Sequence, residues 1–157
     1  RKEIMEYAQK TFISSTFWSE RIGPTAALKT LEIMEREKSW EQISSKGKTI
    51  RKGWKDISIR NKVPIKILGI PALSTFTFNH KDSIKFKTFL TQEFLNSSIL
   101  ASNGFYTSTA HTDSIISKYL EIYEGILYKI KKCIDEKESI DRLLNGPVAH
   151  SGFERLN

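Results

Sequence analysis

Two short runs of apolar residues near the middle of the chain have the pattern of paired strands. They cover Ile65–Ile70 and Leu73–Phe78, and Pro71 lies between them. In the second run apolar and hydroxyl residues alternate, which is typical of a strand that buries one face. We therefore expect two strands joined as a hairpin or by a short loop. A further short strand is expected at residues 99–101, and residues 105–108 extend the sheet.

Elsewhere the apolar residues recur three or four positions apart, as they do in amphipathic helices. This spacing predicts five helices, at residues 1–9, 24–38, 39–61, 82–96 and 113–134. Ser39 is expected to cap the third helix, and Thr112 or Asp113 the last. One apolar stripe of the third helix contains both of its tryptophans, and we interpret it as packing: Trp40, Ile43, Gly47, Ile50, Trp54 and Ile57.

The order of these elements and the composition indicate a globular α+β chain. From about residue 60 the order is strand, strand, helix, strand, helix, which predicts a small sheet with helices on one face. Hydrophobic residues make up 39% of the 157 residues and aromatics 11%, which excludes a disordered chain. No apolar run approaches the roughly 20 residues of a membrane helix. The single Cys133 indicates a reducing compartment, and we expect a cytoplasmic protein with a partly buried structural thiol.

The formal net charge of +7 raises the question of an acidic partner or nucleic acid. The basic residues are spread over several segments, and each group lies on the polar side of an apolar pattern. No nucleic-acid-binding motif frames them. We therefore interpret the charge as a solvated surface and expect no nucleic-acid partner.

A polar, hydroxyl-rich stretch carries Ser14, Ser15, Thr16 and Ser19 just before the second helix. Pro24 suits the first turn of that helix because its missing N–H would have no partner there. Hydroxyls and free backbone N–H groups before a helix favour anion binding. A helix cap with a turn is the other interpretation of the same residues.

Two segments resemble one enzyme family. The first is Ser14-Ser-Thr-Phe-Trp-Ser-Glu-Arg-Ile-Gly-Pro-Thr-Ala-Ala-Leu28, and the second is Ala101-Ser-Asn-Gly-Phe-Tyr-Thr-Ser-Thr-Ala-His-Thr-Asp113. They resemble class III pyridoxal-phosphate (PLP) aminotransferases, in the branch similar to glutamate-1-semialdehyde aminomutase. The first segment matches the region after the cofactor lysine, and the second matches the region near the C-terminus.

The resemblance implies an aspartate-aminotransferase-like type I PLP fold. Residues 1–38 would end the large domain, residues 39–61 would form a connecting helix, and residues 62–157 would form the small domain. The lysine that binds the cofactor would precede Arg1, so the chain alone would contain no catalytic residue. Thr16, with Ser15 beside it, would contact the PLP phosphate of the neighbouring subunit in an obligate homodimer. The substrates would be small-molecule amino donors and acceptors.

The second segment departs from the aminomutases at one point. Those enzymes carry a glutamate in the loop that here reads Ser102-Asn-Gly104, and this chain has no carboxylate between Leu100 and Thr112. Transamination is therefore at least as good an interpretation as the aminomutase reaction. Asn103 is a candidate substrate contact, and a plain Asn-Gly turn is the alternative.

Other chemistry finds little support in the residues. His111 lies next to a helix cap without a carboxylate or nucleophile in its sequence context, so we assign it to a turn. Three scattered histidines and one cysteine give no metal-ligand spacing. A non-catalytic α+β binding or interaction module remains the alternative to an aminotransferase part.

Overall fold

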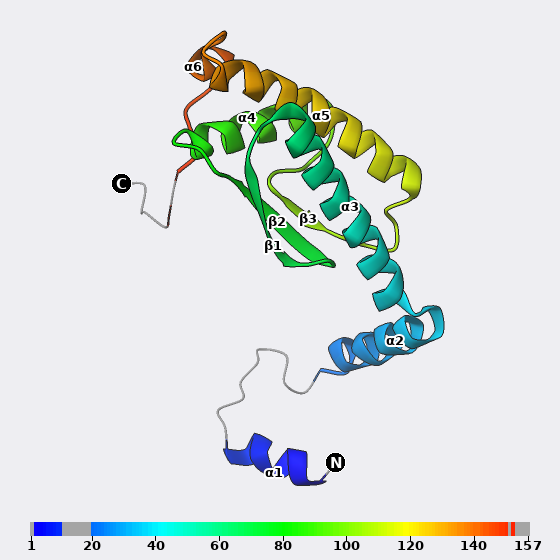
Figure 1. Cartoon of the computed structure of the whole chain (residues 1–157). Helices are drawn as coiled ribbons and strands as arrows, with labels where there is room; N and C mark the ends of the chain where they lie inside the picture. Colours follow the sequence, from blue (N-terminus) through cyan, green and yellow to red (C-terminus); the bar gives the residue numbers. More distant parts are fainter. Residues whose placement is uncertain (1, 11–19, 151, 153–157) are drawn as a thin grey trace. The chain divides into compact units, whose positions relative to one another are not determined.

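The structure is a computed structural model that describes residues 2–10, 20–150 and 152. The chain divides into two compact units, Arg1–Ser39 and Trp40–Asn157. Figure 1 shows helices in the first unit and a small sheet with helices in the second. No helix within the described residues is long and apolar enough to cross a membrane.

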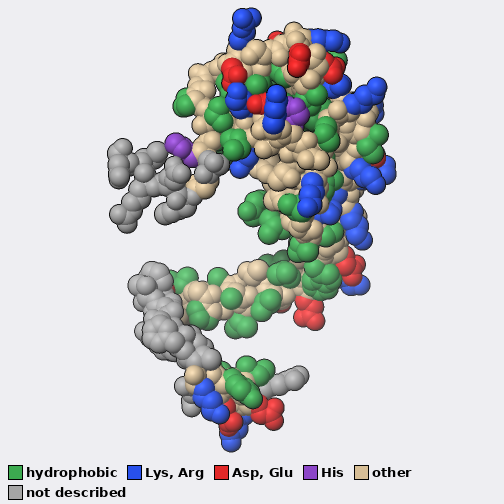
Figure 2. Space-filling view, turned by 60° about the vertical axis from the view of Figure 1, so that its left-hand side comes forward, with side chains coloured by type: hydrophobic (Ala, Val, Ile, Leu, Met, Phe, Trp, Pro, Cys, Tyr) green, Lys and Arg blue, Asp and Glu red, His purple; other side chains and the backbone are tan. Residues whose placement is uncertain are grey.

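The first unit contains helices α1 (Lys2–Lys10) and α2 (Ile22–Glu37), close to the predicted ranges. Pro24 lies in the first turn of α2, as expected. None of the residues of α2 is buried, and Leu28 and Leu31 are 70% and 61% exposed. Figure 2 shows hydrophobic side chains along the surface of this helix. The apolar stripe of α2 therefore contributes no residue to a buried core among the described residues.

One residue separates α2 from the next helix, α3 (Ser39–Asn61). Lys38 adopts a left-handed conformation with φ of 47°, and its backbone N–H donates to carbonyls of the last turn of α2. The chain returns to helical geometry at once, so Ser39 is the first residue of α3. The prediction that Ser39 precedes and caps the helix was therefore wrong, because a cap residue lies outside the helical backbone.

The second unit contains three strands and the remaining helices. After α3 come β1 (Ile65–Ile70), β2 (Leu73–Phe78), α4 (Ser83–Asn96), β3 (Gly104–Tyr106), α5 (Asp113–Ile134) and α6 (Ile140–Leu143). The hairpin and the two long helices match the predicted ranges within a residue. Thr112 caps α5, because its hydroxyl accepts a hydrogen bond from the N–H of Ile115 at 3.3 Å. The short helix α6 was not predicted.

The sheet is antiparallel throughout, with strand order β1-β2-β3. The predicted strand at residues 99–101 was wrong. After α4 the N–H of Ile99 donates back to the carbonyl of Phe94 at 2.9 Å, and the N–H of Ala101 donates to Ile99. These local bonds end the helix and take the donors that a strand would use. The sheet resumes only at β3.

The core lies between the sheet and helices α3, α4 and α5. Its centre is aromatic: the ring of Phe76 on β2 lies 4.8 Å from that of Trp54 and 5.5 Å from that of Tyr123. Edge-to-face geometry of this kind adds to the stabilisation from burial. The predicted stripe of α3 is buried from Gly47 onward, whereas Trp40 is largely exposed.

Gly47 fixes the approach of α3 to the hairpin. A Cβ atom at this position would lie 1.9 Å from the carbonyl oxygen of Pro71, in the connection between β1 and β2. No side chain fits there unless the backbone moves, so only glycine allows this contact. The helix and the hairpin turn are therefore held at backbone-to-backbone distance.

Candidate functional site

The predicted phosphate contacts, Ser15 and Thr16, lie outside the described residues. Their assignment to a cofactor phosphate stays a prediction from the resemblance.

Asn103, the predicted substrate contact, lies in the loop that leads into β3. Its side-chain nitrogen donates to the carbonyl of Phe76 at 2.7 Å, and its own carbonyl accepts from the N–H of Phe76 at 2.9 Å. The side-chain amide and the backbone carbonyl of Asn103 therefore bond both backbone groups of Phe76, as a neighbouring strand would. This use of the amide holds the loop against β2, and the proposed contact with a substrate stays untested.

The same loop is also tied to α4. The hydroxyl of Thr91 donates to that of Ser102 at 2.9 Å. Next to Asn103 is a small hollow of about 190 Å³ whose rim includes Lys87 and Ser83. The loop is therefore fixed from two sides, and a cation and a hydroxyl lie beside it.

His111 forms part of the turn before α5, as predicted. Its Nδ1 atom accepts from the N–H of Ser108 at 3.0 Å, and its ring lies 4.8 Å from that of Phe105. This bond and the ring contact hold His111 in the turn. Beside it is a cleft of about 330 Å³ with Lys118 and Tyr119 in its lining.

Two buried tyrosines on α5 differ in their hydrogen bonding. Tyr119 accepts from the indole N–H of Trp54 at 3.0 Å, whereas the hydroxyl of Tyr123 has no partner among the described residues. Burial raises the pKa of both phenols above the ordinary value of 10.0. Both therefore stay protonated near neutral pH, and Trp54 has the packing role expected for it.

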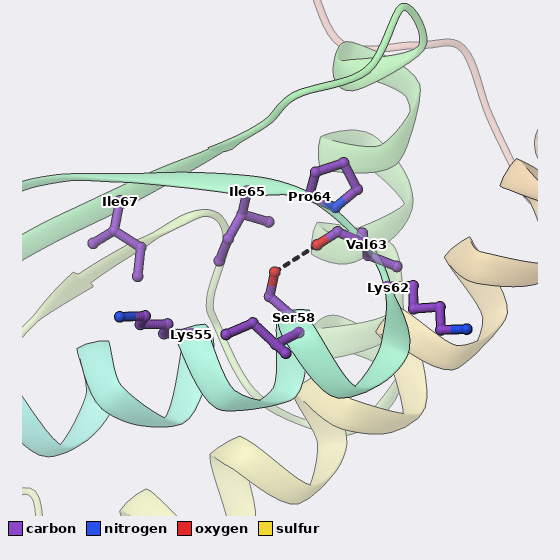
Figure 3. Close-up of a pocket in the computed structure, with 8 residues that line it drawn as sticks. Lys55, Ser58, Lys62, Val63, Pro64, Ile65 and Ile67 are labelled. Atoms are coloured by element: carbon purple, nitrogen blue, oxygen red, sulfur yellow. Dashed lines mark hydrogen bonds between the residues drawn. The ribbon is translucent and has the colours of Figure 1, made fainter.

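A groove of about 670 Å³ lies between α3 and β1 (Figure 3). Lys55 and Ser58 project from α3 toward Ile67 and Ile65 of β1. The Ser58 hydroxyl donates to the carbonyl of Val63 at 2.5 Å, which fixes the turn between the helix and the strand. The groove is apolar on its floor and has lysines in its lining.

The described residues offer no other reactive centre. Burial, followed by the charge of Glu138, raises the pKa of the Cys133 thiol, so the nucleophilic thiolate is disfavoured. Cys133 is half-buried and packs against the core, as predicted. No group of three or more His, Cys, Asp or Glu residues able to hold a metal ion occurs among the described residues.

A lysine that binds PLP covalently needs an enclosed site and a partner set for the cofactor. None of the lysines whose side chains the structure describes is buried. The described lysines therefore do not offer an enclosed site of this kind, and the position of the cofactor lysine before Arg1 stays a prediction from the resemblance.

No protein-family model matches the sequence. It is 27% identical over 142 residues to the 3-aminobutyryl-CoA aminotransferase of Cloacimonas acidaminovorans, covering 85% of this chain and 34% of that protein. It is 26% identical over 149 residues to a glutamate-1-semialdehyde 2,1-aminomutase of Oceanobacillus iheyensis, covering 84% of this chain and 35% of the relative. A glutamate-1-semialdehyde 2,1-aminomutase of Natranaerobius thermophilus is 25% identical. The chain thus spans about a third of the length of the curated relatives it matches.

A solved structure of a PLP enzyme has a similar fold. The chain superposes with a TM-score of 0.69 on the Sphingopyxis sp. MTA144 FumI protein in its PLP internal aldimine form, at 19% identity. The match covers 89% of this chain and 34% of that one. The predicted α+β fold of the PLP-transferase type is therefore confirmed. The chain is similar, over most of its length, to the C-terminal portion of class III PLP-dependent aminotransferases and aminomutases, which confirms the resemblance in its sequence.

Proposed function

We propose that this sequence is the C-terminal part of a PLP-dependent transaminase and acts together with a cofactor lysine elsewhere in the same protein. The observation that carries the proposal is its similarity, over 82% to 85% of the chain, to curated aminotransferases and aminomutases. PLP acts as an electron sink when bound, which is the chemistry that amino transfer needs. Residues 1–157 contribute scaffold and phosphate contacts.

The proposed roles follow the order of the chain. Residues 1–38 end the large domain, residues 39–61 form a helix that connects the two domains, and residues 62–157 form the small domain. Ser15 and Thr16 donate hydrogen bonds to the cofactor phosphate, a dianion that short hydroxyl donors suit. The whole protein acts as a cytoplasmic homodimer on small-molecule amino donors and acceptors, with Asn103 near the substrate.

Transamination is favoured over the aminomutase reaction by the loop around Asn103. This loop has no carboxylate from Leu100 to Thr112, whereas the resemblance implies a glutamate there in the aminomutases. The amide of Asn103 already holds the loop against β2. The loop is therefore anchored to the sheet but lacks the carboxylate that the aminomutases carry there.

The first test separates this proposal from an autonomous enzyme, one that forms the covalent PLP adduct within these 157 residues. The 157-residue chain is mixed with PLP, reduced with borohydride and analysed by peptide mass spectrometry. We expect no stoichiometric adduct on a single lysine, because surface lysines react weakly and without selectivity. One specific, stoichiometric PLP-lysine adduct would overturn the division of roles.

The second test concerns Thr16 in the longer protein that contains the cofactor lysine. Thr16→Val keeps the side-chain shape and removes the hydroxyl. The loss of one hydrogen bond to a charged phosphate should cost about 1.5–3 kcal/mol, or roughly ten- to a hundredfold in cofactor affinity. Equilibrium dialysis of PLP at matched protein concentration measures this change, and Ser19→Ala serves as a control in the same segment.

Mixed dimers test whether Thr16 acts across the subunit interface. If one chain carries Thr16→Val and its partner lacks the cofactor lysine, one site keeps an intact lysine and an intact threonine. If both changes lie on the same chain, neither site is intact. If Thr16 acts across the interface, cofactor retention should therefore be higher in the first dimer than in the second, whereas the reverse order would place Thr16 in its own subunit's site. Equal retention by both, or by Thr16→Val and the parent protein, would show that Thr16 only forms a turn.

A further inference from the structure

Among the residues that the structure describes, β1 is an edge strand of the sheet. β1 is first in the strand order and has β2 on one side only. The N–H of Asn79 donates to the carbonyl of Pro64, which places Pro64 and every second residue after it in the bonds to β2. Hydrogen-bonding direction alternates along an antiparallel strand, so the backbone groups of Ile65 and Ile67 point outward.

Arg51 covers only the hairpin end of this edge. Its guanidinium donates to the carbonyls of Leu68 at 3.1 Å and of Gly69 at 2.9 Å, and to the hydroxyl of Ser74. Arg51 donates no hydrogen bond to the outward backbone groups of Ile65 and Ile67. An edge of this kind is a template for another strand.

The apolar side chains near this edge are incompletely buried. Phe76 and Phe78 of β2 are buried, whereas Ile65 and Ile67, which point to the same side from β1, are only half-buried. Ile59 of α3 is 66% exposed in the floor of the groove. A further strand beside β1 would bury these three isoleucines and continue the inner layer of the sheet.

The groove is also positively charged. Lys55 and Lys62 belong to its lining, which contains no carboxylate. Figure 3 shows Lys55 below Ile67, with Lys62 at the other end of the groove. Lys131 is the main cause of the lowered pKa of Asp135, and the charge of Lys62 adds to it. Lys55 forms no ion pair among the described residues. Acidic side chains in the added strand would compensate these charges.

We propose that the β1 edge and this groove form a docking site for an extended polypeptide segment with alternating apolar and acidic side chains. The segment adds to the sheet as a fourth strand, with main-chain bonds to Ile65 and Ile67 and its apolar side chains over Ile59. A second copy of the chain fits less well, because pairing of two β1 edges would bring their lysines together. This inference goes beyond the proposed transaminase role and does not depend on it.

The test uses a short blocked peptide that alternates glutamate and valine, labelled for fluorescence anisotropy. A peptide that alternates lysine and valine is the charge-reversed control. We expect binding of the acidic peptide alone, with backbone amide shifts at Ile65 and Ile67 in ¹⁵N spectra. Ile67→Pro removes an outward N–H, which edge strands tolerate, and should weaken binding by about tenfold or more.

Lys55→Glu should weaken the acidic peptide by about tenfold through charge reversal. Lys118→Glu is the matched control, because Lys118 lies beside β3 at the opposite edge of the sheet. It should change the affinity by less than about twofold. Circular dichroism confirms that each variant is folded.

Three results would overturn the proposal: no binding of the acidic peptide, affinity that is the same for Ile67→Pro and Lys55→Glu as for the parent, or amide shifts confined to other elements. Concentration-dependent shifts at Ile65 and Ile67 without peptide, together with dimers in sedimentation, would assign the edge to a second copy and also overturn it.

Discussion

The two units of the chain differ in what they do with their apolar side chains. In the Trp40–Asn157 unit, large aromatic residues from three helices and the sheet are buried around Phe76. In the Arg1–Ser39 unit, α2 buries none of its residues although it has a clear apolar stripe. Helices in proteins owe most of their stability to packing of such a stripe. A helical pattern in the sequence therefore predicts a helix in both units, but a core in only one of them.

The largest effect should come from separating the two units. A chain of residues 40–157 should keep a cooperative thermal transition, because it retains every residue of the buried cluster. A peptide of residues 1–39 should have little helix in water, since its helices lack a buried face. Circular dichroism with thermal scans measures both. A cooperative transition in the shorter peptide, or none in the longer chain, would remove the distinction between the units.

The next effect concerns two glycines within the folded unit. Gly47→Ala places a Cβ against the backbone of Pro71 and should cost about 1–3 kcal/mol or more, because backbone must move. Gly125→Ala, on α5 with nothing within 4 Å of its Cβ, should gain about 0.5–1 kcal/mol from helix propensity. Urea unfolding midpoints provide the measurement. A gain at both positions would mean that α3 does not approach the hairpin closely.

Single hydroxyl deletions should distinguish the two buried tyrosines. Tyr119→Phe leaves the buried indole N–H of Trp54 without an acceptor and should cost about 1–3 kcal/mol. Tyr123→Phe removes a hydroxyl that has no partner among the described residues, so the free energy of unfolding should stay the same or rise slightly. Equal losses in the two variants would show that Tyr123 has a partner, such as a buried water.

Local pattern was enough to predict the regular elements of the second unit. The hairpin and α5 agree with the predicted ranges because each has a strong period and clear ends, such as Thr112 at the start of α5. The region after α4 was less predictable. An apolar run at residues 99–101 has strand composition, but its backbone donors are used to close the helix. That competition depends on the geometry of the helix end, which composition does not record.

The candidate site was less accessible to sequence reasoning than the fold. Asn103 was singled out from the family resemblance, and its bond to Phe76, 27 residues away, follows only from the pairing of β2 with that loop. The groove beside β1 likewise depends on how α3 and β1 come together in the folded chain. The helical pattern alone does not single out Ile59. Its exposure beside an edge strand is visible only in the folded chain.

The strand order β1-β2-β3 follows the order of the chain, and this has a consequence for how the sheet forms. The hairpin joins neighbouring segments through Pro71 and Ala72, so its closure belongs to the events that take about 1–10 μs. β3 must wait for α4 to fold and return the chain to β2, which adds a loop-closure cost. Changes in the hairpin should therefore slow folding, whereas changes in β3 should mainly speed unfolding.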